Sequence, residues 1–292
     1  MRRSQLDDLG LDEAVVFPNF GLLWERPLSA DLEATLLNMA AWNRWTAVIR
    51  QEGGGRLHPV AHLSLRDPGW LASQLEVLAR AGVRLAMVAP GLVDGKPLSH
   101  PDHDRCWDAF ADVGVAPVFH ISAFPHPFDD AWYQGDPDEV APVLSSIFIW
   151  TAPALALADM AVNGVFARHP TLRVGVMELS AVWVPMFLMM LDGGYAFQAR
   201  FNGVSPRSFL SQPPGDYVRQ QVRVAAFGFE RPDKLIRQAG DIFMFCSDYP
   251  HAEGLARPLA DYQAMCGPVE GAEKELLYGA NLSWLLGERA HT

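Results

Sequence analysis

The sequence predicts an α/β protein in which short parallel strands alternate with longer helices. Apolar, β-branched runs of strand length recur along the chain, and the stretches between them carry apolar residues at the three- and four-residue steps of a helix. No low-complexity segment or charge run interrupts this alternation. Such alternation is typical of βα units around a parallel sheet, and 292 residues are enough for a single α/β barrel. We therefore expect one domain over residues 1–292.

The runs with strand character number seven and are spread over the whole chain. In chain order they are Ala14–Phe17, His58–Ser64, Val83–Ala89, Val115–His120, Leu172–Leu179, Val222–Phe227 and Ile242–Ser247. A closed barrel of βα units needs eight strands. The shortage lies at the front, because residues 1–13 have the pattern of the end of a helix followed by a turn.

Several of the expected helices end at glycine, which readily takes the left-handed backbone found after a helix. They are Asp31–Ile49 before Gly53–Gly55, Trp70–Ala81 before Gly82, and Asp102–Val113 before Gly114. Pro232–Ala239 begins with proline and is followed by Gly240, an asymmetry that helix termini favour. These ends place the helices between the expected strands.

Two apolar stretches need a separate interpretation. Val140–Ala158 has the length of a membrane span, but its prolines and hydroxyl groups indicate a buried helix pair instead. The methionines of Val182–Leu191 are expected to fill gaps in the core. Pro185, close to the start of the helix expected there, is tolerated in a first helical turn.

The charge balance argues against nucleic acids and membranes as partners. Lys and Arg number 23 against 34 Asp and Glu, so the formal net charge is −11 and the isoelectric point is near 5.2. Such a chain repels phosphate backbones and acidic lipid surfaces. The N-terminus has no apolar segment of signal-peptide type, and three cysteines disfavour a disulfide framework. We expect a cytoplasmic protein.

Three of the expected strands lead directly into a residue that can bind a metal ion. His120 ends the fourth run, Glu178 follows Leu172–Met177, and Asp248 follows Ile242–Ser247. In a parallel βα barrel the active site lies at the carboxyl ends of the strands. Neutral imidazole and ionised carboxylate both donate lone pairs to divalent ions at about 2.0–2.2 Å. The pattern therefore predicts a metal centre at this end of the barrel.

Two longer motifs resemble those of a known family. Arg168–Val174 followed by Glu178–Pro185 resembles the strand-six signature of the amidohydrolase-related proteins, and Ser247–Gly254 resembles their strand-eight signature. Leu6–Phe17 and His58–Pro68 are similar to the family's second and third strands. This group includes aminocarboxymuconate semialdehyde decarboxylase and the resorcylate-type decarboxylases, and the resemblance extends over essentially the whole chain.

The resemblance implies a fold, an activity and a set of site residues. It implies a distorted (β/α)8 TIM barrel that carries one divalent ion, zinc by preference and manganese as the alternative. The implied reaction is hydrolysis or non-oxidative decarboxylation of a small organic acid, aromatic or muconate-type acids included. His120 matches the strand-five metal histidine, and Asp248 matches the strand-eight aspartate that binds metal and moves protons. Barrels of this family commonly pair, so a homodimer is expected.

Glu178 and the first strand depart from the family's pattern. Glu178 stands where the decarboxylases carry histidine, while many relatives have glutamate there, so the reaction type stays open. The family's first strand normally supplies two ligands as His-x-His or an acidic equivalent, and this chain contains no His-x-His. Either Met1 is a misassigned start within a longer reading frame, or the protein is a shortened relative. The rival to an enzyme is thus an inactive barrel that binds a ligand or a partner subunit.

Three other histidines bear on the site or on the core. His251 lies three residues after Asp248, where it would reach the barrel mouth either as a substrate contact or only to orient its own loop. His58 and His62 are four residues apart on one expected strand and so point the same way, like a ligand pair. They lie before and within that strand rather than at its end, so we expect them to pack in the core.

Overall fold

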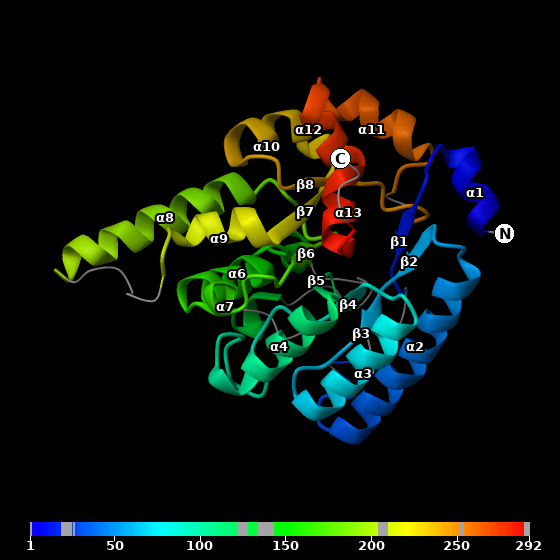
Figure 1. The fold of residues 1–292 in the computed structure, drawn as a ribbon. Helices are drawn as coiled ribbons and strands as arrows, with labels where there is room; N and C mark the ends of the chain where they lie inside the picture. Colours follow the sequence, from blue (N-terminus) through cyan, green and yellow to red (C-terminus); the bar gives the residue numbers. More distant parts are fainter. Residues whose placement is uncertain are drawn as a thin grey trace.

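The strands follow one another in chain order and all their pairings are parallel (Figure 1). The computed structural model describes residues 2–18, 25, 27–121, 128–133, 143–203, 210–251 and 254–288. Its strands are β1 (Ala14–Val16), β2 (Leu57–Pro59), β3 (Ala61–His62), β4 (Leu85–Met87), β5 (Ala116–Phe119), β6 (Val174–Val176), β7 (Val222–Phe227) and β8 (Phe243–Cys246). β2 and β3 are separated only by Val60, so the strands occupy the seven expected positions.

Two sheets result from these pairings. β1 pairs with β2, and β3 through β8 form a six-stranded sheet in the order β3-β4-β5-β6-β7-β8. Neighbours in space are thus neighbours in sequence, as in a (β/α) barrel, and the expected fold class is confirmed. Before β1 the described residues hold helix α1 (Arg2–Leu9), in agreement with the helix and turn expected there.

Helices lie around the strands (Figure 1). The longer ones are α2 (Leu32–Glu52), α3 (Pro68–Arg80), α4 (Asp104–Val113), α6 (Thr151–Val162), α8 (Val184–Phe201), α9 (Pro214–Gln221), α10 (Pro232–Ala239) and α11 (Pro258–Cys266). The shorter ones are η2 (Pro101–His103), η3 (Asp130–Tyr133), α5 (Val143–Ile147), α7 (Val165–Arg168), η4 (Gly228–Glu230), α12 (Gly271–Glu275), η5 (Leu276–Ala280) and α13 (Asn281–Leu286).

Local capping explains where these helices begin and end. The side chains of Asp31 and Asp67 accept hydrogen bonds, both of 2.9 Å, from backbone N–H groups in the first turns of α2 and α3. The Asp67 cap starts α3 at Pro68, two residues earlier than the apolar spacing predicts. Gly114 ends α4 in a left-handed conformation with φ of 68°, and α10 has the predicted bounds.

The strands divide the core into an inner and an outer part. Leu85 and Met87 of β4 belong to the inner cluster together with Val118 of β5, whereas Ala86 and Val88 pack outward against the helices. Alternate residues of a strand point to opposite faces, and β4, β5, β7 and β8 accordingly contribute to both clusters. The inner cluster fills the space that the strands surround.

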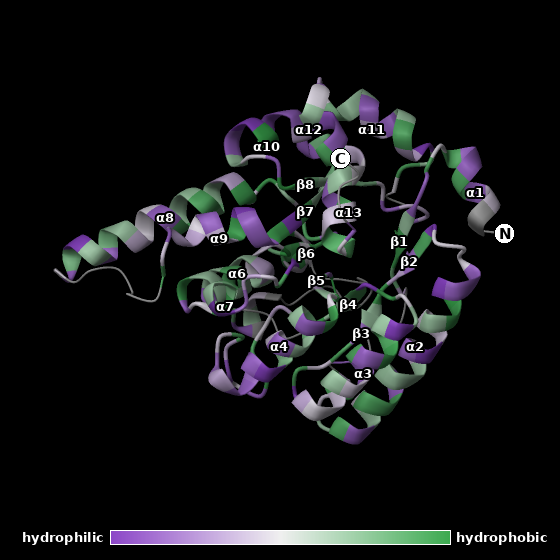
Figure 2. Ribbon diagram, viewed as in Figure 1, coloured by the Kyte–Doolittle hydropathy of each residue, from purple (hydrophilic) through white to green (hydrophobic). Residues whose placement is uncertain are grey.

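Both apolar stretches differ in part from expectation. α6 contributes buried residues to the core, but α5 has none, because Val143 and Ile147 of this short helix remain exposed. On α8, Met186, Met189 and Met190 are exposed rather than gap-filling. The physical reason is that Phe187, Leu188 and Leu191 form the buried face of this part of α8, so the methionines between them fall on the exposed face. Farther along, α8 extends away from the barrel, and hydrophobic residues continue along this projecting part (Figures 1 and 2). In the described part of the chain, no helix is long and apolar enough to cross a membrane.

Candidate metal centre

The register of the sheet brings the predicted site residues to one edge. Phe119 of β5 lies opposite Val176 of β6, so His120 and Glu178 follow neighbouring strands at the same end. Asp248 follows β8 by two residues, and His251 lies three residues further on. These residues were predicted to converge, and the structure places them together.

His120 and Glu178 are in direct contact. His120 Nε2 lies 2.8 Å from Glu178 Oε2, and His120 Nδ1 donates to the backbone oxygen of Ile121 at 2.8 Å. A carbonyl oxygen only accepts, so the Nδ1 bond assigns a proton to that nitrogen and leaves Nε2 facing the carboxylate. The ring of Phe17, which follows β1, stacks on the imidazole with ring centres 3.9 Å apart. His120 is therefore held on three sides and is only 2% exposed.

Glu178, Asp248 and His251 form one group. One ligand atom from each lies within 4.8 Å of the others, and His251 Nδ1 is 3.1 Å from Asp248 Oδ1. His120 is outside this group of three but touches it through Glu178. Of the two metal-binding residues expected from the resemblance, Asp248 belongs to this group and His120 contacts it through Glu178.

The donor set fits a divalent cation. Two carboxylates and a pair of imidazoles are ligands that zinc and manganese accept in proteins. Ligand atoms that each bind one ion at about 2.0–2.2 Å lie roughly 3 Å apart, close to the 2.8 Å and 3.1 Å contacts seen here. Two acidic side chains without a cation would also repel one another. The residues present therefore fit the implied metal.

The backbone at this edge is unusual. Glu178, Ser180 and Asp248 have φ values of 57°, 62° and 54°, in the left-handed region that residues other than glycine rarely adopt. Such conformations persist only where surrounding contacts enforce them, and they concentrate at functional sites. Trp183 supplies one contact, since its indole N–H donates to the backbone oxygen of Ser180 at 2.9 Å.

Glu230 was not among the site residues predicted from the sequence. It supplies further contacts to the same loop. Its carboxylate lies in η4 directly after β7 and accepts hydrogen bonds from Ser180 and Ala181. A signal was present, because Glu230 is an acidic residue just past an apolar strand and before the proline that starts α10. Local pattern alone does not reveal its partners, which lie about 50 residues earlier.

Comparison with known proteins identifies the family. A family model described as amidohydrolase matches residues 29–281. The chain belongs to the amidohydrolase family. No curated protein matches it. The match confirms the sequence-based resemblance and the expectation of a metal-dependent amidohydrolase-related enzyme, whereas the inactive barrel is not favoured.

Solved structures agree with this assignment. An amidohydrolase from Mycobacterium avium subsp. paratuberculosis is 27% identical with a TM-score of 0.83, and the match covers 98% of this chain and 73% of that one. The 5-carboxyvanillate decarboxylase of Sphingomonas paucimobilis is 18% identical with a TM-score of 0.77, over 99% and 82% of the two chains. A dihydroxybenzoic acid decarboxylase from Polaromonas, with bound manganese and 2-nitroresorcinol, is 17% identical with a TM-score of 0.73, over 98% and 85%.

Cys246 contributes no thiolate to the amidohydrolase site. It ends β8 two residues before Asp248, and burial raises the pKa of its thiol well above the ordinary value. The neighbouring carboxylates of Asp248 and Glu178 act in the same direction. The donor group that the described residues form consists of carboxylates and an imidazole, and Cys246 is not part of it.

His58 and His62 lie outside this cluster, as expected. Both are buried, and each pairs with a carboxylate: His58 Nε2 lies 2.6 Å from Glu13, and His62 Nε2 lies 3.2 Å from Glu25. Burial lowers the pKa of His58. Their predicted role in the core is confirmed, and their contacts with carboxylates were not foreseen.

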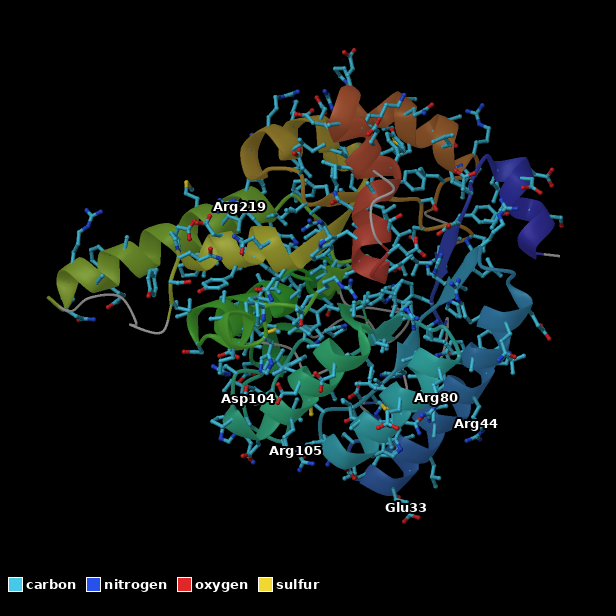
Figure 3. All side chains as sticks on the ribbon, viewed as in Figure 1. Glu33, Arg44, Arg80, Asp104, Arg105 and Arg219 are labelled. Carbon is cyan, nitrogen blue, oxygen red and sulfur yellow. The ribbon has the colours of Figure 1, made fainter. Side chains whose placement is uncertain are left out.

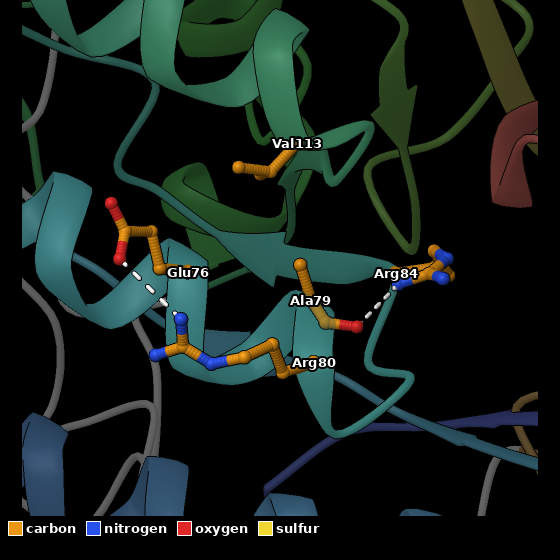
Figure 4. Close-up of a pocket in the computed structure, with 5 residues that line it drawn as sticks. All are labelled: Glu76, Ala79, Arg80, Arg84 and Val113. Atoms are coloured by element: carbon orange, nitrogen blue, oxygen red, sulfur yellow. Dashed lines mark hydrogen bonds and ion pairs between the residues drawn. The ribbon is translucent and has the colours of Figure 1, made fainter.

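Arg44 and Arg84 could bind a substrate carboxylate by their charge, but neither lies at the site. Arg44 extends outward from α2 (Figure 3). Arg84 precedes β4 at the opposite end of the strands, beside a pocket of about 410 Å³ lined by Glu76, Ala79, Arg80, Arg84 and Val113 (Figure 4). Its Nη1 donates to the backbone oxygens of Ala79 and Val83, at 3.0 and 3.3 Å, so Arg84 supports the fold rather than the site.

Proposed function

We propose that this amidohydrolase decarboxylates a small aromatic carboxylic acid without an oxidant. The observation that carries the proposal is the group of Glu178, Asp248 and His251, which combines metal donors with a carboxyl group poised to move a proton. The decarboxylases of aromatic acids among the structural neighbours support this substrate class. A divalent ion, when bound, would anchor the substrate's oxygens and polarise them.

The proposed reaction assigns the proton to Asp248. A protonated Asp248 carboxyl donates its proton to the ring carbon that bears the substrate carboxylate. The bond between that carbon and the carboxylate then breaks, its electron pair returns to the ring, and carbon dioxide leaves. One proton is consumed and one carbon dioxide is released, so the step needs no other reactant.

His251 and His120 support this transfer in different ways. Asp248 is 9% exposed and His251 is 40% exposed, so the 3.1 Å contact between them links a buried carboxyl to solvent and can restore the proton. His120 is buried and its ring is fixed by Ile121 and Phe17. It therefore holds Glu178 in one orientation.

Hydrolysis is the second candidate, and Glu178 favours it. The decarboxylases that the motifs resemble carry histidine at this position, so a carboxylate there gives the centre one more negative charge. A carboxylate in this place can accept a proton from an attacking water, as a general base does. Hydrolysis would release an acid and an amine or alcohol instead of carbon dioxide.

The experiment is a paired measurement of metal content and product. Purified protein is assayed by elemental analysis for zinc and manganese and then tested for carbon dioxide release from hydroxylated benzoates and muconate-type acids. Asp248→Asn removes the proton donor, and Glu33→Gln on the exposed face of α2 serves as the control. Carbon dioxide release that depends on Asp248 supports decarboxylation. Metal-loaded protein that releases none from any of these acids contradicts it.

The identity of the metal belongs to the same proposal. Imidazole donors suit zinc, and carboxylate donors also suit manganese. The manganese in the Polaromonas decarboxylase makes manganese the first ion to add back after chelation. Recovery of activity with manganese but not with zinc would assign it.

We also propose that the protein is a cytoplasmic homodimer. The three cysteines, Cys106, Cys246 and Cys266, are all free, which suits a reducing compartment. For the dimer, the supporting feature is α8, where Met189 is 68% and Phe201 is 76% exposed on a projecting helix. Sedimentation should give a dimer that Met189→Lys converts to monomer, while Leu37→Lys on α2, also exposed, should leave it intact. A wild-type monomer would refute the dimer.

A further inference from the structure

The carboxylate of Glu230 is buried at the edge of the candidate centre, and its hydrogen bonds within the described residues go to two short segments. It is 7% exposed. Oε1 accepts from Ser180 Oγ at 2.5 Å and from Ala181 N at 2.8 Å, and Oε2 accepts from Phe227 N at 2.8 Å. Phe227 is the last residue of β7, whereas Ser180 and Ala181 belong to the loop that follows β6. Glu230 therefore ties that loop to the end of the neighbouring strand.

The tied loop carries Glu178 in a conformation that needs support. Glu178 and Ser180 both have left-handed backbones, and Glu230 binds the hydroxyl of Ser180 and the N–H of the next residue. Residues other than glycine stay in this region only when their surroundings enforce it. The 2.8 Å contact between Glu178 and His120 depends on where this loop places the Glu178 carboxylate.

We infer that Glu230 is a positioning residue that fixes Glu178 in the metal centre by holding the loop after β6 to the end of β7. Glu230 is outside the group of metal donors that the described residues form, and its oxygens accept three hydrogen bonds from the loop and the strand end. The inference rests on the proposed function for its effect on metal binding. Its effect on the position of the loop does not depend on that function.

Glu230→Gln is the sharpest variant, because it keeps the size of the side chain and removes only one acceptor oxygen. The amide oxygen can still accept from Ser180 and Ala181. The amide nitrogen would then face the N–H of Phe227, donor against donor. The loop and the strand end can no longer both keep their bonds, so the loop shifts.

A buried carboxylate on the following helix provides the matched control. Asp233 is 4% exposed in the first turn of α10 and pairs with Arg231 and Arg237 at 2.9 and 3.1 Å. Among the described residues, the carboxylate of Asp233 bonds to these two arginines and not to the loop after β6. Asp233→Asn therefore disturbs a buried carboxylate close in sequence without touching the position of Glu178.

The test measures manganese affinity by titration, following the electron paramagnetic resonance signal of free Mn²⁺. Loss of a residue that orients a metal ligand typically weakens binding about 10- to 100-fold, and Glu230→Gln should fall in this range. Asp233→Asn should leave the affinity unchanged even if it lowers the melting temperature. Ser180→Ala removes one of the three bonds and should weaken binding less, with an effect that is not additive with Glu230→Gln.

Crystal structures of metal-free wild type and Glu230→Gln give the second measurement. A displaced Glu178 carboxylate in the variant supports the inference, even if the wild type binds no Mn²⁺, in which case the proposed function fails and the positioning role stands. An unmoved Glu178 together with unchanged Mn²⁺ affinity overturns the inference. Equal weakening by Glu230→Gln and Asp233→Asn also overturns it, because a general loss of stability then explains both. If Glu230→Gln does not fold, Ser180→Ala decides by the same two measurements.

Discussion

Three arginines at the amino ends of the strands and two acids of the site at the carboxyl ends are satisfied in different ways. At the amino ends, Arg84 and Arg173 donate to backbone oxygens, of Ala79 and Val83 and of Gly114 respectively. Arg223 binds Asn281 at 2.7 Å and lies over the ring of Trp284 at 4.0 Å. At the carboxyl ends, the site contains the acids Glu178 and Asp248.

The acids at the carboxyl ends are bonded to groups that can exchange for a cation or a proton. Glu178 faces His120, and Asp248 faces His251. The arginines contact main-chain oxygens and a tryptophan ring, which neither take up nor release protons at neutral pH. A histidine, in contrast, can give up its contact with a carboxylate and bind a metal ion instead. The arginines at the amino ends of the strands therefore support the fold, whereas the acids at the carboxyl ends can take part in chemistry.

Among the effects that should distinguish the carboxyl ends of the strands from the amino ends, the largest is expected on metal binding. Asp248→Asn should abolish stoichiometric metal and reduce turnover by more than about 100-fold, because it removes a donor oxygen and the proposed proton source. The same change should not lower the melting temperature, since asparagine tolerates the left-handed backbone at this position and one acidic charge is lost. Elemental analysis and thermal unfolding check the two parts. If Asp248→Asn keeps its metal, the charge of Asp248 is not needed for metal binding, which contradicts the proposed difference between the two ends.

A smaller effect is expected at the amino ends. Arg223→Met should lower the free energy of unfolding by about 2 kcal/mol, because Asn281 loses a buried partner and Trp284 loses its cation. Mn²⁺ affinity should stay within a factor of two, that is about 0.4 kcal/mol. Urea unfolding and the Mn²⁺ titration measure these quantities, with the exposed Arg44→Met as control. A large loss of affinity would mean that the two ends are coupled.

The smallest effect is a pH dependence of stability from His58, also near the amino ends. Burial lowers the pKa of His58, although Glu13 opposes the shift. The unfolded chain therefore takes up a proton more readily than the folded one once the pH falls below about 6.5, and the free energy of unfolding should decrease there as the pH falls. His58→Gln should flatten this slope between pH 7.5 and 5.5, whereas His100→Gln, which is more exposed, should not. A steeper slope in His58→Gln would reverse the sign and refute the assignment.

Short sequence patterns were enough to predict the strands and the polar residues at their ends. The strands are apolar runs, and His120, Glu178 and Asp248 are the polar residues that end them, so both could be predicted locally. The contact of His120 with Glu178 and the stacking of Phe17 on His120 join residues far apart in the chain, and no periodicity encodes them. The core role expected for the methionines of α8 was wrong for Met186, Met189 and Met190, because apolar spacing identifies a helix face but not what covers it.

The left-handed backbone at Glu178 also bears on how such a centre can diversify. Histidine, like aspartate and asparagine, is enriched in this region, whereas β-branched residues are genuine outliers there. Exchange of glutamate and histidine at this position would therefore change the charge of the centre by one unit while the loop keeps its path. The charge of the site can therefore change between relatives while its shape stays the same. This allows different reaction types to evolve on the same scaffold.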